Sequence, residues 1–191
     1  MESKIAIFAS GNGTNMQGIC DYFQNSVDIH PSILFCNCKD AFVLQRAKQL
    51  SLPTCIISKQ NLNDPNFMLP ILQKQAITHL VLAGFLCLIP PYLVQAYPKH
   101  ILNIHPALLP LYGGKGMYGS HVHEAVVKNK EKESGISIHY IDEHYDQGNL
   151  LFQARCEVKP NDSPETLAAR IHELEQKYFP IIIEKWIKNV L

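Results

Sequence analysis

The chain alternates short apolar runs with longer segments in which apolar residues recur every three or four positions. The short runs have the length of β-strands and cover residues 4–9, 32–36, 54–57, 79–83 and 101–104. The segments with helical spacing lie between them, at residues 15–24, 41–50 and 66–75. Such alternation is typical of βαβ units around a buried sheet. It predicts an α/β fold, with a doubly wound, mostly parallel sheet and helices on both faces.

Beyond residue 105 the pattern changes. Residues 106–120 are rich in glycine and proline, which predicts a long loop, and long loops in compact domains are usually functional. A helix is predicted for 121–130, and strands for 135–140 and 150–158. Ser163 and Pro164 fit the N-cap and first turn of a last helix, which Pro180 is expected to break or kink before 181–191. Without repeats or linkers, we expect a single catalytic domain, 1–191.

Composition supports a globular protein that acts on small molecules. Hydrophobic residues make up 47% of the 191 residues, and Lys+Arg equal Asp+Glu at 17 each. The balanced charge gives no reason to expect nucleic-acid binding. No apolar run reaches the roughly 18 residues of a membrane span, and the run at 5–9 is too short for a signal peptide. Cys36 and Cys38 form a C-x-C that we interpret as small buried hydrophobes of a reducing cytosol. We therefore expect a cytoplasmic protein without membrane partners.

A glycine-rich turn, residues 10–15, directly follows the first predicted strand and precedes a helix. Its glycines allow a tight turn and a close approach of backbone N–H groups to a ligand, while a helix N-terminus favours an anion. Thr14 and Asn15 can add side-chain donors, so a phosphate group suits this turn. Met16 stands where the dinucleotide fingerprint has its third glycine, and no Gly-Lys-Ser/Thr follows. The alternative is an ordinary strand-to-helix turn.

Asn103 and His105 lie at the carboxyl end of the fifth predicted strand, where open α/β sheets bind ligands. Residues two apart in a strand face the same side, so the two side chains project together. An amide donor beside an imidazole can stabilise an oxyanion and transfer a proton. The alternative for His105 is a structural histidine at a strand end.

Asp146 precedes a glycine turn at the end of an acidic loop. A carboxylate close to His105 would favour the imidazolium and hold its orientation. The alternative is a turn residue before Gly148.

Five stretches, 9–15, 82–85, 102–110, 135–139 and 146–149, together resemble the folate-dependent glycinamide ribonucleotide formyltransferases of de novo purine biosynthesis. The resemblance runs nearly end to end and implies a formyltransferase-like variant of the Rossmann fold. It also implies transfer of a formyl group from the cosubstrate 10-formyltetrahydrofolate to the amine of 5-phosphoribosylglycinamide, without a metal. Small molecules would be the partners, and the protein would be a monomer or a homodimer.

The resemblance further implies roles for individual residues. The amine would attack the formyl carbon, and the catalytic residues would be Asn103, His105 and Asp146. Asn103 and His105 would stabilise the oxyanion, and Asp146 would keep the His105 imidazole charged. The phosphoribosyl substrate would contact Gly13, Thr14, Asn15, Gly84, Pro106, His172 and Glu175. The folate would contact Leu86, Cys87, Leu88, Ile89, Asn103, Asp142, Glu143, His144, Tyr145 and Asp146.

The sequence departs from the family pattern on the folate side. The loop 111–120 is longer than in many relatives, Cys87 stands where many have arginine, and residues 61–68 contain no arginine. Lys115 is either a replacement for this charge or a solvated loop lysine.

Three other functions remain open. Methionyl-tRNA formyltransferase and formyltetrahydrofolate hydrolase share the core but usually carry a further domain, and a non-catalytic nucleotide- or folate-binding module would share only the fold.

Overall fold

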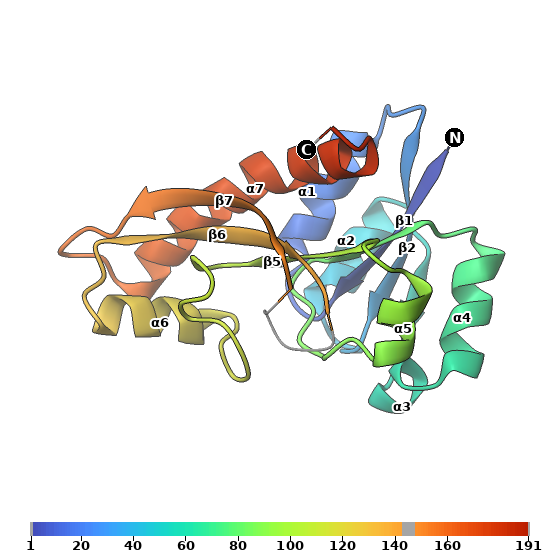
Figure 1. Cartoon of the computed structure of the whole chain (residues 1–191), viewed down its shortest axis with the longest axis horizontal. Helices are drawn as coiled ribbons and strands as arrows, with labels where there is room; N and C mark the ends of the chain where they lie inside the picture. Colours follow the sequence, from blue (N-terminus) through green and yellow to red (C-terminus); the bar gives the residue numbers. More distant parts are fainter. Residues whose placement is uncertain (1, 143–147, 191) are drawn as a thin grey trace.

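A computed structural model describes residues 2–142 and 148–190 of the chain, built around one mixed sheet (Figure 1). Within that part the sheet has seven strands in the order β3-β2-β1-β4-β5-β6-β7. The strands are β1 (Ser3–Ala9), β2 (Ile29–Cys36), β3 (Thr54–Ile56), β4 (His79–Leu82), β5 (Ile101–His105), β6 (Glu133–Tyr140) and β7 (Leu150–Glu157). The first five strands pair in parallel, and β6 and β7 add an antiparallel edge. The predicted doubly wound, mostly parallel sheet is confirmed.

Helices cover both faces of the sheet. They are α1 (Thr14–Phe23), α2 (Phe42–Gln49), α3 (Lys59–Leu62), α4 (Pro65–Lys74), α5 (Pro91–Ala96), α6 (Ser120–Lys128) and α7 (Pro164–Ile187). Successive residues of β1 point to opposite faces, so that Ile7 packs in one core with α1, α2, α6 and α7, and Phe8 packs in the other with α3, α4 and α5. Figure 1 shows α3, α4 and α5 grouped at one end of the molecule.

The last helix, α7, differs from its prediction. Ser163 caps it in a capping box with Thr166, as its sequence indicates, but the helix continues through Pro180 to Ile187. The predicted break is therefore wrong. Pro180 removes one backbone hydrogen bond, at a cost of about 3 kcal/mol. The residues around it are buried apolar side chains, each worth about 1.5–3 kcal/mol, namely Phe179, Ile182, Ile183 and Trp186. None of the described helices, α7 included, combines the length and apolar character that crossing a membrane requires.

The strand order places a crevice at the carboxyl ends of β1 and β4. The chain leaves β1 toward β2 and β3 on one side and later continues from β4 to β5 on the other. In open α/β sheets, ligands bind where the winding direction changes in this way. The segments that follow β1, β4 and β5 meet at this crevice.

Candidate active site

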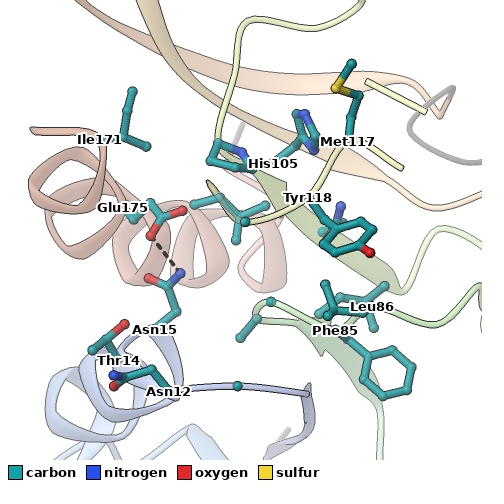
Figure 2. A pocket seen from close by; sticks show the side chains of 18 of the residues that line it. Asn12, Thr14, Asn15, Phe85, Leu86, His105, Met117, Tyr118, Ile171 and Glu175 are labelled. Atoms are coloured by element: carbon teal, nitrogen blue, oxygen red, sulfur yellow. Dashed lines mark hydrogen bonds between the residues drawn. The ribbon is translucent and has the colours of Figure 1, made fainter. Parts of the chain in front are cut away.

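A cavity of about 750 Å³ occupies this crevice. Its volume lies within the range of ligand pockets, which is roughly 300–1,000 Å³. The turns after β1 and β4, the end of β5, the loop residues 114–119 and one face of α7 line it. Figure 2 shows polar side chains at one end of the cavity and apolar side chains at the other.

The polar end is formed by the turn between β1 and α1. Gly13 has a φ of 82°, and an added Cβ would lie 2.8 Å from the Cα of Val43. No side chain caps the N-terminus of α1, so its first backbone N–H groups are available to an anion. Arg46 holds the turn from α2, since its Nε and Nη2 atoms donate to the backbone and side-chain oxygens of Asn12 at 3.0 and 2.9 Å. The turn is therefore held in a conformation in which these N–H groups can bind an anion.

A hydrogen-bond network links this turn to α7. Asn15 Nδ2 donates to Glu175 Oε2 at 3.0 Å, and Asn15 Oδ1 accepts from Gln176 Nε2 at 3.0 Å (Figure 2). His172 Nδ1 lies 3.1 Å from the same carboxylate oxygen. The hydrogen bond to Glu175 raises the pKa of His172 above its ordinary value, against an opposing effect of burial. The Asn15 side chain thus orients Glu175, and its contact with a phosphate stays a prediction.

Asn103 and His105 lie on β5 and both line the cavity. The antiparallel register places Asn103 opposite His139 and His105 opposite Ser137. Asn103 Nδ2 lies 3.1 Å from His139 Nε2, and His139 Nδ1 lies 2.9 Å from the carbonyl oxygen of Tyr140. Because a carbonyl only accepts, His139 Nδ1 carries the proton and Nε2 accepts from the Asn103 amide. His139 thereby fixes the orientation of that amide.

His105 is buried, and Tyr112 sets its orientation. Its Nε2 lies 2.7 Å from the carbonyl oxygen of Tyr112, so that nitrogen carries a proton and donates. The Tyr112 hydroxyl donates to Glu131 at 2.6 Å and accepts from Asn129 at 2.9 Å. The loop after β5 is thus anchored to the end of α6 and holds the imidazole from outside the strand.

The apolar end of the cavity lies after β4. Leu86 and Leu88 are exposed, although large hydrophobic side chains are usually buried, while Phe85 and Ile89 are buried beneath them. Figure 2 shows Tyr118 from the long loop on the same side of the cavity as Leu86. Such an exposed apolar surface is suited to an aromatic ring.

Thirteen of the predicted site residues line the cavity, and they come from every predicted segment except the loop 142–146. They are Gly13, Thr14, Asn15, Gly84, Leu86, Cys87, Leu88, Ile89, Asn103, His105, Pro106, His172 and Glu175. Asp142 is not a lining residue, although its neighbour Ile141 is. Glu143, His144, Tyr145 and the catalytic candidate Asp146 lie outside the described residues. Lys115 is exposed and lines the cavity.

The sequence did not reveal every lining residue. Met117, Tyr118 and His123 line the cavity from the long loop and α6, and Ile171 lines it from α7 (Figure 2). The glycine-rich composition of 106–120 predicted a functional loop, but no pattern selected Tyr118 within it or His123 in the helix that follows. The described residues contain no cluster of three or more His, Cys, Asp or Glu side chains that could hold a metal ion.

The doubly wound sheet and the cavity at its switch point define an α/β protein with a site of the kind that binds small ligands. An amide and an imidazole lie in this cavity, between an uncapped helix N-terminus and an apolar wall. The chain matches the formyl transferase family over residues 3–183 and belongs to it.

Relatives of this chain carry a more specific name. The chloroplastic phosphoribosylglycinamide formyltransferase of Arabidopsis thaliana is 40% identical, over 94% of this chain and 64% of that protein. The phosphoribosylglycinamide formyltransferase of Haemophilus influenzae is 35% identical, over 96% of this chain and 86% of that protein. The crystal structure of the Anaplasma phagocytophilum protein of that name has a TM-score of 0.89 at 27% identity, covering 99% of this chain and 89% of the other. The chain thus spans slightly less than two thirds of the plant relative and most of the bacterial ones.

Proposed function

We propose that this protein transfers a formyl group from 10-formyltetrahydrofolate to the amine of 5-phosphoribosylglycinamide. The observation that carries the proposal is that Asn103 and His105 lie in one cavity with the glycine-rich turn, residues 10–15, on one side and the apolar wall on the other. We call residues 10–15 the phosphate-type turn. The names of its relatives support this choice of substrates. We further propose that it acts in the cytoplasm, as a monomer or a homodimer.

The phosphoribosyl substrate is held at the polar end. Its phosphate takes the uncapped backbone N–H groups at Gly13–Asn15, and protonated His172 adds a positive charge nearby. Glu175, held by Asn15 and His172, accepts hydrogen bonds from the ribose hydroxyls. This placement directs the glycinamide amine toward β5.

The formyl group reacts between Asn103 and His105. The amine nitrogen forms a bond to the formyl carbon, and negative charge develops on the formyl oxygen. An amide carries two N–H donors, so Asn103 can donate one to His139 and the other to this oxygen. Protonated His105 stabilises the same charge, and Asp146 keeps that imidazole protonated. The carbon–nitrogen bond to the folate then breaks.

The folate lies along the apolar end. Leu86, Leu88 and Tyr118 pack against the pteridine and benzoyl rings, and Cys87 contributes the small side chain between the two leucines. Lys115, at the cavity wall, is placed to meet the glutamate carboxylates.

Mixing the purified protein with 10-formyltetrahydrofolate and glycinamide ribonucleotide, while following the folate absorbance, tests the proposal. We expect release of tetrahydrofolate that requires both substrates. Release without the ribonucleotide would indicate a hydrolase, and formylation of methionyl-tRNA instead of the ribonucleotide would indicate the tRNA enzyme. The absence of any release would leave a binding module.

A further inference from the structure

His123 on α6 is a buried histidine in the cavity wall, and the steps proposed above do not use it. Only 7% of its surface is exposed, yet it lines the cavity. Its Nδ1 atom is buried and has no hydrogen-bond partner among residues 2–142 and 148–190. Buried polar atoms without a partner are rare in folded proteins, because the missing hydrogen bond lowers stability. This unpaired buried nitrogen and its place in the cavity wall point to a role in the chemistry of the cavity.

Two ionisable groups from other elements, Glu175 and His105, line the same cavity and affect the pKa of His123. Burial lowers the pKa of His123 below its ordinary value, Glu175 on α7 opposes that shift, and His105 on β5 adds to it. The net shift favours the neutral form of His123, and a positive charge on His105 further disfavours its protonation. If His105 is protonated, as the proposed function requires, and His123 is neutral, the two histidines can serve as the acid and the base of one reaction.

Formyl transfer requires both an acid and a base. When the amine bonds to the formyl carbon, its nitrogen becomes positively charged and must lose a proton. When the bond between the formyl carbon and the folate nitrogen breaks, the electron pair stays on that nitrogen, which must gain a proton. One proton is lost and one is gained, so no further reactant is needed.

His123 lines the same cavity as Glu175 and His105. Glu175 and His105, both labelled in Figure 2, reach the cavity from α7 and β5, and His123 is electrostatically coupled to both. Under the proposed function, Glu175 holds the ribose and His105 meets the formyl group. The glycinamide nitrogen connects the ribose side of the substrate to the formyl group, so under this function it lies between Glu175 and His105.

We propose that His123 is a second catalytic histidine, which accepts the proton lost by the attacking amine while His105 supplies a proton to the departing folate nitrogen. This assignment rests on the proposed function. The two imidazoles then exchange their protons with solvent, and the starting states return.

The first test is the kinetics of His123→Gln, which keeps a polar side chain but cannot accept a proton near pH 7. General-base catalysis contributes about 10²–10⁴ in rate, so we expect kcat to fall at least 100-fold while KM for the ribonucleotide changes less than about threefold. His30→Gln, at a half-exposed histidine of β2, is the matched control and should keep wild-type kinetics. An unchanged kcat, or a rise in KM alone, would overturn the assignment.

The second test separates chemistry from folding. His123→Ala should regain at least tenfold in kcat when imidazole is added, because imidazole can enter the cavity at the vacated position. His123→Leu should melt no lower than the wild type, since it removes a buried nitrogen that has no partner. A lower Tm together with no rescue would show a structural role instead. If the wild-type protein shows no formyl transfer at all, the proposed function fails before these variants are compared.

Discussion

At the scale of single residues, Gly13 is the most constrained position of the phosphate-type turn. Its φ of 82° is unfavourable for other residues, and a Cβ there would collide with Val43. We expect Gly13→Ala to lower the free energy of unfolding by roughly 2–4 kcal/mol, from backbone strain and overpacking together. Urea unfolding measures this loss. Gly11→Ala is the matched control, because an added Cβ there meets nothing within 4 Å. Equal losses in both variants would contradict the argument.

The two polar residues of β5 give a second prediction at this scale. Loss of one oxyanion donor typically costs about 10²–10³ in rate, so we expect Asn103→Ala to reduce kcat by that factor. His105→Ala should reduce it at least as much, because it removes both a charge and a proton donor. Asn66→Ala, at an exposed position of α4, serves as the control. Near wild-type turnover in both β5 variants would refute the assignment.

These residues also show what a single sequence can reveal about a site. Asn103 and His105 were predictable because a strand has a period of two, which places both on one face. His139 is paired with Asn103 by the antiparallel register, and no local pattern encodes that register. His123 lies beside the buried Val122 in a helix. From the sequence alone, such a position is as typical of a structural core residue as of a functional one.

At the scale of elements, α7 is both a core helix and a wall of the site. His172 and Glu175 lie one turn apart on it and face the cavity, and their hydrogen bond raises the pKa of His172. A histidine with a raised pKa keeps its interaction with the carboxylate below its ordinary pKa and loses it as the pH rises through the raised value. The charge offered to the phosphate should therefore decline on the alkaline side.

We expect Glu175→Gln to lower the pKa of His172 toward its ordinary value, which an NMR titration of the imidazole measures directly. KM for the phosphoribosyl substrate should then begin to rise at a lower pH than in the wild type. Glu173→Gln, on the exposed side of the same helix, should leave the His172 titration unchanged. A His172 pKa that is the same in Glu175→Gln as in the wild type would disprove the coupling.

The elements differ in how far their sequences predict them. The buried strands β1, β4 and β5 are continuous apolar runs with turn residues beside them, and they were predicted to within two residues at each end. The helices α3 and α5 were missed, since at four and six residues they are too short to show a helical period. Pro180 was misjudged because burial of the surrounding side chains, a tertiary effect, outweighs a local rule.

At the scale of the whole molecule, the carboxyl ends of the strands carry the site, and a buried histidine at the opposite end of β4 makes the free energy of unfolding depend on pH. His79, at the start of β4, is buried against the ring of Trp186 at 4.7 Å and that of His100 at 4.8 Å. Its Nδ1 lies 2.8 Å from the Thr78 hydroxyl. Burial, and secondarily the neighbouring His100, lowers the pKa of His79 to about 4. The folded protein therefore resists protonation of a group that the unfolded chain protonates readily.

The sign of the pH dependence follows from this difference. Above the ordinary histidine pKa both states hold His79 neutral, and its effect on stability is zero. As the pH falls from about 6.5 to about 4, only the unfolded chain takes up the proton, so the free energy of unfolding falls by up to about 3 kcal/mol. Urea unfolding at pH 7 and pH 5, followed by the fluorescence of Trp186, the only tryptophan, measures the change. His79→Phe keeps the aromatic packing without titrating and should lose most of this dependence, whereas His30→Gln should retain it. An equal loss of stability on acidification in His79→Phe and the wild type would show that other groups govern it.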